Sequence, residues 1–279
     1  MKRLIADSGS TKTSWCLMDG GAKRYFTTQG INPFQQTEEQ MTDVLRNEVM
    51  PLTQGIDELF FYGAGCTKEK SVIVRQVFQQ LLGKECSLSV ESDLLGAARA
   101  LCQREAGVVG ILGTGSNSGL YDGVKIVRNV SPLGFILGDE GSGAYIGKRL
   151  VGNCLKHQFS DELCQLFLEE TDSTPADIIQ RVYREHFPNR YLASLSEFCA
   201  RHLDQQEIHG LLVDCFREFF VRNVALYQQP KLPVHFVGSI AWHYREILEE
   251  TARACGYQTG QILQAPIEGL AEYHSVVCR

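Results

Sequence analysis

A short stretch near the start of the chain combines a carboxylate, a glycine, hydroxyl groups and a cation. It reads Asp-Ser-Gly-Ser-Thr-Lys-Thr over residues 7–13. Gly9 lets the backbone approach an anion closely, and Asp7 can hold Mg²⁺ through water because hard cations prefer oxygen ligands. The donors are the hydroxyl groups of Ser8, Ser10, Thr11 and Thr13 and the ammonium group of Lys12. These residues indicate a phosphate site, with an ordinary solvated hairpin tip as the alternative.

A second glycine-rich stretch, Gly-Thr-Gly-Ser-Asn-Ser-Gly, covers residues 113–119. Gly113 and Gly115 flank Thr114 and precede Ser116, so several backbone N–H groups can point the same way and form an anion-binding nest. A flexible tight turn is the alternative. The chain has no P-loop motif, and this stretch returns to a strand rather than opening a helix, which argues against a dinucleotide site.

Three carboxylates stand where acid–base chemistry could use them. Asp93 follows a strand at the start of a helix and is a candidate general base for a reaction in which a hydroxyl group attacks phosphorus. A helix-capping role is its alternative. Asp139 and Glu140 lie between glycines and suit recognition of hydroxyl groups or a metal, although a solvated turn would have the same composition.

Two further positions carry weaker signals. Asn32, in an Asn-Pro turn, could bind a ligand hydroxyl group such as that of a sugar, but such turns are common without a ligand. Gly238 and Ser239 stand between a strand and a helix, where a nucleotide could meet the helix N-terminus. Ser239 as a plain N-cap explains the same pattern.

The elements that must position these residues alternate between strand and helix. Both polar turns join two strands, and the two hairpins begin roughly 105 residues apart. Strands are predicted at residues 3–6, 14–18, 59–62, 86–90, 108–112 and 234–237, and helices at 37–49, 68–82, 205–227 and 268–278. This alternation favours two related α/β domains.

Composition narrows the classes of protein. The 279 residues include 27 Lys and Arg against 33 Asp and Glu, a net charge of −6, so binding to nucleic acid or to an anionic membrane is disfavoured. The sequence contains no apolar run long enough for a membrane span and no signal peptide, which predicts a cytoplasmic protein. The 10 cysteines form no C-x-x-C pair. Cysteines such as Cys16, Cys102, Cys164 and Cys215 are predicted to be small buried residues.

In their order along the chain, these segments resemble the sugar kinase/Hsp70/actin ATPase superfamily. Within it, the chain is similar to the N-acetylglucosamine kinase group of the BadF/BadG/BcrA/BcrD-type ATPase family. Residues 7–13 and 113–119 resemble its two phosphate motifs, residues 234–239 its adenosine motif, and residues 138–142 a block of the sugar-kinase branch. The resemblance implies ATP, Mg²⁺ and an α/β fold of two ribonuclease-H-like domains with mixed sheets, the actin-like/sugar-kinase ATPase fold.

The resemblance also implies roles for single residues. It makes Asp93 the catalytic base and a sugar contact, with Asn32, Asp139 and Glu140 as further sugar-binding residues. Thr114 and Gly115 would contact the γ-phosphate, and Gly238 the adenosine. It implies an N-terminal domain of residues 1–104 that also takes the terminal helix at about 268–279, and a C-terminal domain of residues 105–267. The first motif carries hydroxyl residues where many relatives have glycine.

Three functions follow from this resemblance. The first is an ATP-dependent kinase for an amino sugar, with N-acetylglucosamine and its 6-hydroxyl group as the expected acceptor. The second is an ATP-hydrolysing activator of a reductase or dehydratase, whose iron–sulfur cluster would need cysteine ligands. Cys66 is the one suggestive position for it. The third is a sugar-responsive regulator without catalysis. The sequence leaves the sugar open, and a homodimer is compatible with it.

Overall fold

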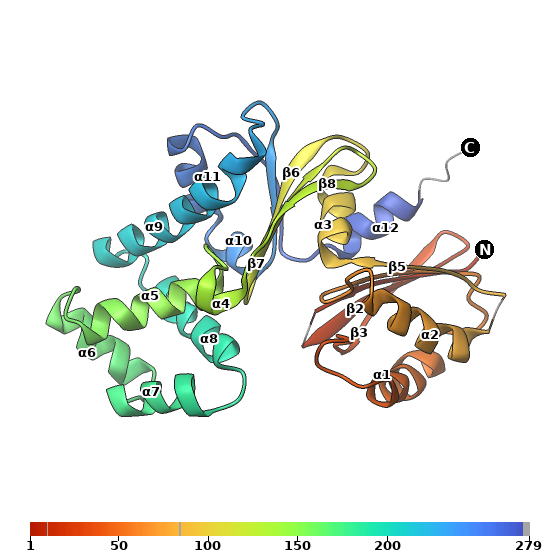
Figure 1. Cartoon of the computed structure of the whole chain (residues 1–279), viewed down its shortest axis with the longest axis horizontal. Coiled ribbons are helices and arrows are strands. Elements are labelled where there is room, and N and C mark those ends of the chain that lie inside the picture. The colour runs from red at the N-terminus through yellow and green to blue at the C-terminus, as the bar shows by residue number, and fades with distance from the viewer. Residues whose placement is uncertain (10, 84, 276–279) are drawn as a thin grey trace. The chain divides into compact units, whose positions relative to one another are not determined.

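The computed structural model describes residues 1–9, 11–83 and 85–275 (Figure 1). Its contacts divide the chain into two compact units. Unit 1 consists of Met1–Glu105, Asp122–Ile126 and Ala265–Arg279, and unit 2 of Ala106–Tyr121 and Val127–Gln264. Ser10 and the last four residues of the predicted terminal helix lie outside the described residues.

Unit 1 contains a mixed five-stranded sheet in the order β3-β2-β1-β4-β5. The strands are β1 (Arg3–Ser8), β2 (Lys12–Asp19), β3 (Ala22–Gln29), β4 (Glu58–Gly63) and β5 (Ser87–Ser92). β1, β2 and β3 pair antiparallel, whereas β1, β4 and β5 pair parallel. The carboxyl ends of β1, β4 and β5 therefore share one edge of the sheet, where polar side chains can gather without breaking the core.

Helices cover both faces of this sheet (Figure 1). One face packs against α1 (Glu38–Val44) and α2 (Lys70–Leu82), and the other against α3 (Asp93–Cys102) and α12 (Ile267–Ser275). Alternate residues of β1 serve the two faces, since Leu4 contributes to one core and Ile5 to the other. A Cβ atom on Gly269 of α12 would lie 2.5 Å from the carbonyl oxygen of Ala100, so α12 packs closely on α3.

Unit 2 repeats this plan with a sheet in the order β10-β9-β6-β7-β8. The strands are β6 (Gly107–Leu112), β7 (Ser116–Tyr121), β8 (Ile126–Val130), β9 (Val234–Val237) and β10 (Thr259–Leu263). β6 pairs antiparallel with β7 and parallel with β9, as β1 does with β2 and β4. The predicted fold class, two related α/β domains with mixed sheets, is confirmed.

The helices of unit 2 bury its apolar core, which includes Phe198, Phe216 and Phe219. They are α4 (Gly134–Leu137), α5 (Gly143–Leu155), α6 (Asp161–Glu170), α7 (Pro175–Arg184), α8 (Pro188–Arg201), α9 (Gln206–Arg222), α10 (Ser239–His243) and α11 (Arg245–Ala254). No helix among the described residues has the length and apolar character that crossing a membrane requires.

Several element predictions need correction. The single helix predicted over residues 205–227 is wrong, because α9 ends at Arg222 and a separate 3₁₀ turn, Val224–Tyr227, follows. The helix predicted over residues 37–49 continues past α1 only as a π-helical turn, Leu45–Val49. Strands β3, β8 and β10 were not predicted. The predicted burial of Cys16, Cys102, Cys164 and Cys215 is confirmed.

Candidate active site

The first phosphate turn joins β1 to β2 in unit 1. Its backbone is held by bonds from the N–H of Gly9 to the carbonyl oxygen of Lys12 and from the N–H of Gly30 to that of Thr11, both 3.0 Å long. The side chains of Thr11 and Lys12 are exposed, so both can reach a ligand. Gly9 meets no obstacle closer than 3.6 Å at its Cβ position, which leaves room in front of the turn.

Two hydroxyl groups of this segment serve the fold instead. Ser8 and Thr13 are buried, and their side-chain oxygens lie 2.7 Å apart in a hydrogen bond. The Ser8 hydroxyl also donates to the carbonyl oxygen of Ile31 and accepts from its N–H. The Thr13 hydroxyl reaches the carbonyl oxygen of Gln29 at 3.2 Å. These hydroxyl groups fasten the end of β3 and the segment that follows it to the turn, so they do not point to solvent as free phosphate donors.

Asp7 lies one residue before the end of β1, where its carboxylate is half-buried. Burial, and then the negative charge of Asp93, raise the pKa of Asp7 from 3.8 to about 7, while Lys12 opposes the shift. Among the residues that the structure describes, none donates a hydrogen bond to this carboxylate. A half-buried carboxylate without donors favours a proton or a cation beside it.

Asp93 is the first residue of α3, but it does not cap the helix. The N-cap is Ser92, whose hydroxyl accepts from the N–H of Leu95 at 3.2 Å. Asp93 Oδ1 accepts from the N–H of Leu94 at 2.8 Å, and the backbone N–H of Asp93 itself also acts to lower the pKa of the carboxyl group. Burial is the main cause that raises the pKa of Asp93. The capping alternative therefore fails, and Asp93 has the partial burial and raised pKa of a functional carboxylate.

Asn32 lies close to this edge of the sheet and is buried. Its side-chain oxygen accepts from the N–H of Phe34 at 2.9 Å and so forms an Asx turn. Gly65 has a left-handed backbone with φ +78°, and a Cβ there would stand 2.7 Å from the same Asn32 oxygen. The next residue, Cys66, is buried, and Asp93 contributes to raising its pKa to about 12. Asn32, Gly65, Cys66 and Asp93 thus border one region of unit 1.

The second phosphate turn joins β6 to β7 in unit 2. The N–H of Gly113 donates to the carbonyl oxygen of Gly115 at 3.0 Å and closes the turn. The N–H groups of Thr114 and Gly115 donate to no residue in the described part of the chain. Thr114 is exposed at the tip. Two neighbouring free N–H groups at a turn are the core of an anion-binding nest.

The start of helix α5 holds this turn in place. The N–H of Gly143 donates to the carbonyl oxygen of Gly113 at 2.8 Å, and the N–H of Ala144 donates to that of Thr114 at 3.1 Å. Ser142 caps the helix with a bond from the N–H of Tyr145. Because the carbonyl groups of the turn face α5, its free N–H groups face away from that helix.

Asp139 and Glu140 are both buried, so the solvated-turn alternative is wrong. The backbone N–H groups of Ser116 and Gly134 lie close enough to the Asp139 carboxylate to lower its pKa. Burial is the main cause that raises the pKa of Asp139 to about 6. Glu140 accepts from the side chain of Asn223 at 3.4 Å. The N–H of Ser116 therefore lies beside Asp139, and we do not take it as a phosphate donor.

A pocket of about 420 Å³ lies between this turn, α8 and α10 in unit 2. Its lining residues are Gly113, Thr114, Arg190, Ala193, Ser194, Ser196, Glu197, Ala200, Ser239, Ile240, His243 and Tyr244. Gly238 has φ +124° and is the N-cap of α10, so Ser239 is not the cap. A Cβ on Gly238 would lie 2.2 Å from the carbonyl oxygen of Leu112. Only glycine lets α10 begin this close to β6.

The wall that α8 supplies was not found from the sequence. Ala193, Ser194, Glu197 and Ala200 line the pocket from one side of this helix. Their spacing is the ordinary one for a helix face, and nothing in their types sets them apart from a solvated surface. Only the packing of α8 against α5 brings them beside the phosphate turn. There a Cβ on Gly147 would stand 1.9 Å from the carbonyl oxygen of Leu192.

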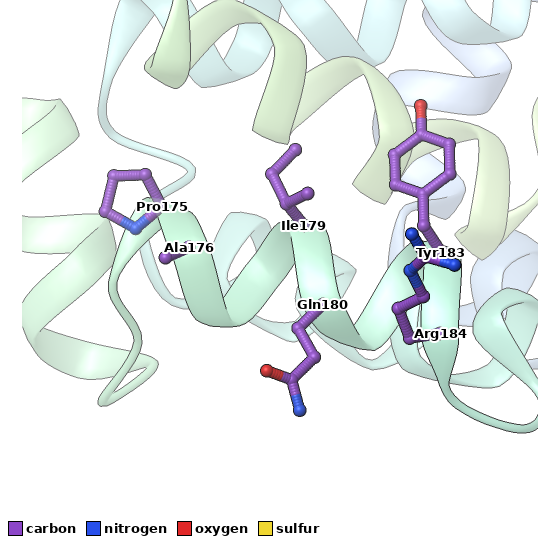
Figure 2. A pocket seen from close by; sticks show the side chains of 6 residues that line it. All are labelled: Pro175, Ala176, Ile179, Gln180, Tyr183 and Arg184. Atoms are coloured by element: carbon purple, nitrogen blue, oxygen red, sulfur yellow. The ribbon is translucent and has the colours of Figure 1, made fainter.

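A second hollow, of about 930 Å³, lies on the outer side of α7. Figure 2 shows its lining, Pro175, Ala176, Ile179, Gln180, Tyr183 and Arg184, which all belong to this helix. None of the predicted site residues borders it. It has one wall and no convergent polar groups, so we do not count it as part of the active site.

The described residues contain no group of three or more His, Cys, Asp or Glu side chains that could hold a metal ion on its own. Mg²⁺ does not need one, because it commonly binds one or two carboxylates and completes its shell with water and substrate phosphates. Asp7 fits that arrangement, since no described residue donates to its carboxylate and its charged form is disfavoured. The residues present therefore fit a magnesium ion that arrives with a nucleotide.

No protein-family model and no curated protein matches the chain. Solved structures do. A protein from Porphyromonas gingivalis, a proposed N-acetylglucosamine kinase, is 49% identical over 97% of this chain and 98% of its own, with a TM-score of 0.93. A second proposed N-acetylglucosamine kinase, from Chromobacterium violaceum, is 17% identical over 98% of both chains, with a TM-score of 0.77. A ROK-family glucokinase from Streptomyces griseus, solved with glucose and AMPPNP, shares the fold at 16% identity, covering 99% of this chain and 98% of its own, with a TM-score of 0.63.

Proposed function

Because the chain belongs to the N-acetylglucosamine kinase-like family of the sugar kinase/actin-type ATPases, we propose that it transfers the γ-phosphoryl group of ATP to an amino sugar. The acceptor we propose is the 6-hydroxyl group of N-acetylglucosamine. Full-length similarity to the P. gingivalis protein supports both the phosphate donor and the class of acceptor. The products would be ADP and the sugar 6-phosphate.

The observation that carries this proposal is that Asp93 has a raised pKa and does not cap α3. A general base must accept a proton from the attacking hydroxyl group, and it works best when its pKa is raised toward the working pH. Burial raises the pKa of Asp93, and Ser92 has taken over the capping of α3. Asp93 would accept the proton of the sugar hydroxyl group while the oxygen of that hydroxyl group attacks phosphorus. Asn32 would orient the sugar beside it.

Unit 2 would bind the nucleotide. The pocket between α8 and α10 has room for an adenosine, since small-molecule sites are typically a few hundred cubic ångströms. The free N–H groups of Thr114 and Gly115 would hold the γ-phosphate, where they stabilise the charge that develops in the transition state. Gly238 and Ser239 would contact the adenosine. We do not assign phosphate contacts to the Thr13 hydroxyl or the Ser116 N–H, because the fold uses both.

Mg²⁺, when bound, supplies positive charge that neutralises the phosphate oxygens during transfer. Asp7 would hold it, directly or through water. Lys12 is exposed on the same turn, close enough for its charge to oppose the raised pKa of Asp7, and it would attract the nucleotide phosphates. Among the described residues of the turn, Thr11 carries the remaining hydroxyl donor.

The geometry of Cys66 argues against the iron–sulfur activator. The thiol is buried, and its pKa is raised to about 12, mainly by burial. A Cβ on Gly63 would lie 2.8 Å from the Cys66 sulfur, so this side chain is packed into unit 1. A bridging cluster ligand must instead be a thiolate at the surface of its subunit.

The test is ADP release from Mg·ATP, measured with N-acetylglucosamine, glucosamine, glucose, N-acetylmannosamine and no sugar. The wild-type chain should release ADP fastest with N-acetylglucosamine. Asp93→Asn should lower turnover by at least about 10²-fold, as expected for loss of a general base, and should still bind AMPPNP. Asp43→Asn, which removes an exposed carboxylate of α1 in the same unit, is the matched control. Equal ADP release with and without sugars would overturn the kinase, and full turnover of Asp93→Asn would overturn its role.

A further inference from the structure

We propose that Asp139 is a positioning residue of the second phosphate turn, which holds the free N–H groups of Thr114 and Gly115 in line for a phosphate. This goes beyond the sugar contact that the family resemblance implies. It rests on the proposed function, because it takes the turn to be the site of the nucleotide phosphates. All the contacts that support it lie within unit 2.

The turn is held from two sides. On one side, the first N–H groups of α5 bind the carbonyl oxygens of Gly113 and Thr114. On the other side, the Asp139 carboxylate lies close enough to the backbone N–H of Ser116, the residue that follows the turn, for that N–H to lower the pKa of the carboxylate. A Cβ on Gly115 would stand 2.9 Å from Asp139 Oδ2, so the carboxylate lies directly against the turn. These contacts occupy the groups around the two free N–H donors and leave those donors to a ligand.

Asp139 is itself held firmly enough to act as a support. Its N–H donates to the carbonyl oxygen of Pro132 at 2.9 Å, and its carbonyl oxygen accepts from the N–H of Ser142 at 3.1 Å. Its backbone is left-handed, with φ +53°. The backbone N–H of Gly134, the first residue of α4, also lies close enough to the carboxylate to lower its pKa. A buried side chain with these partners is fixed before any ligand arrives.

The charges around Asp139 reduce the repulsion that its carboxylate would exert on an anion bound at the turn. A bare carboxylate there would repel a phosphate group. The N–H groups of Ser116 and Gly134 and the ammonium group of Lys148 offset part of the negative charge of Asp139. Lys148 is fixed by its own bond to the carbonyl oxygen of Phe135 at 2.9 Å. The nearby carboxylate of Glu140 adds negative charge, and burial remains the largest influence on Asp139.

A charge effect and a positioning effect of Asp139 predict opposite changes in nucleotide affinity for one substitution. If Asp139 acted on the nucleotide only through its charge, Asp139→Asn would remove repulsion and tighten nucleotide binding. If Asp139 positions the turn, the same substitution weakens binding, because an amide oxygen is a weaker acceptor than a carboxylate for the Ser116 N–H. Asparagine tolerates the left-handed backbone, so the variant does not add strain.

The experiment is calorimetric titration of the full chain with Mg·AMPPNP in the absence of sugar. Asp139→Asn should weaken binding by about 10-fold. Gly115→Ala should weaken AMPPNP binding similarly, because its methyl group would push the Asp139 carboxylate away from the turn. Asp214→Asn, an exposed carboxylate of α9, and Gly210→Ala, whose Cβ position is open space, are the matched controls and should bind as the wild type does.

Activity then separates this inference from the proposed function. Weaker AMPPNP binding in both variants, with unchanged affinity for the sugar, supports the positioning role. Unchanged or tighter AMPPNP binding, with a raised KM for the sugar alone, overturns it and leaves the kinase intact. A wild-type chain that binds AMPPNP but phosphorylates no sugar overturns the kinase, while weaker binding in the variants would still support the role of Asp139. A wild-type chain that binds no AMPPNP overturns both.

Discussion

Replacing Asp7 by asparagine should stabilise unit 1 at alkaline pH while impairing catalysis. The folded chain raises the pKa of Asp7 from 3.8 to about 7, first through burial and then through the charge of Asp93. Ionised Asp7 therefore destabilises the ligand-free fold at the pH at which the proposed magnesium site would bind its ion. Asparagine has nearly the same shape and cannot ionise, so it removes this cost.

The size of the effect follows from linkage between proton binding and folding. Because the folded pKa lies above the unfolded one, the folded chain binds the proton more tightly, and its stability falls as pH rises from about 4 to about 7. One proton changes the free energy of unfolding by about 1.4 kcal/mol per pH unit in this range. The full cost is then on the order of 4 kcal/mol, and about 3 kcal/mol of it develops between pH 5 and pH 8. Lys12 offsets part of the burial effect.

The assay is urea unfolding at pH 5 and pH 8, with EDTA and without nucleotide. The chain has two tryptophans, and Trp15 is fully buried in unit 1, so a Trp242→Phe background lets fluorescence report on this unit. In that background, the stability gain from Asp7→Asn should be about 3 kcal/mol larger at pH 8 than at pH 5. Asp43→Asn, at an exposed position on α1, should show no such difference.

Two results would refute this reasoning. A gain from Asp7→Asn that is equal at the two pH values would mean that the carboxylate is ionised at pH 5 and that its pKa is not raised. A loss of stability at both values would mean that the carboxylate makes favourable contacts in unit 1. Asp7→Asn should also fail to gain stability from Mg·AMPPNP to the extent that the wild type does, because the residue proposed to hold Mg²⁺ is lost.

The remaining predictions use glycines whose Cβ positions are known. Gly147→Ala should destabilise unit 2 by about 2 kcal/mol, because its methyl group would overlap the carbonyl oxygen of Leu192 and push α8 from α5; chemical denaturation measures this. Gly152→Ala, at an open position of the same helix, should instead stabilise by up to about 1 kcal/mol. Gly65→Ala should raise the KM for the sugar several-fold, since its methyl group would displace Asn32, and should leave AMPPNP titrations in the absence of sugar unchanged. A higher affinity for the sugar would contradict this.

The elements that the sequence predicts well are those with local signals. The strands at β1 and β6 are continuous apolar runs that end in glycine-rich turns, and both were predicted close to their observed positions. Helix α7 carries the same kind of local signal, because it begins at Pro175 directly after the N-cap Thr174. By contrast, most residues of β3 are polar and exposed, and few of its side chains are buried. A strand of this kind is stabilised by pairing with β2 across a tight turn, in which Asp19 lies opposite Ala22, and its own residues carry no apolar alternation that would predict it.

For the site, the sequence by itself determined which residue types stand at the ends of which strands. It placed Asp7, Asp93 and Asp139 at turns or helix starts, where their side chains could meet a ligand. The tertiary structure decided what each group does there. Ser92 rather than Asp93 caps α3, and Asp139 binds the neighbouring phosphate turn.

The physical reason is that a hydrogen-bond partner or a buried environment comes from segments distant in the chain. The Ser8 hydroxyl is occupied because β3 leads Ile31 back to it, and the pocket beside the second turn has a wall because α8 packs on α5. Residue types and spacing are local properties, so they identify candidates for chemistry. Burial, pKa and the availability of a donor depend on packing between elements, which only the folded chain determines.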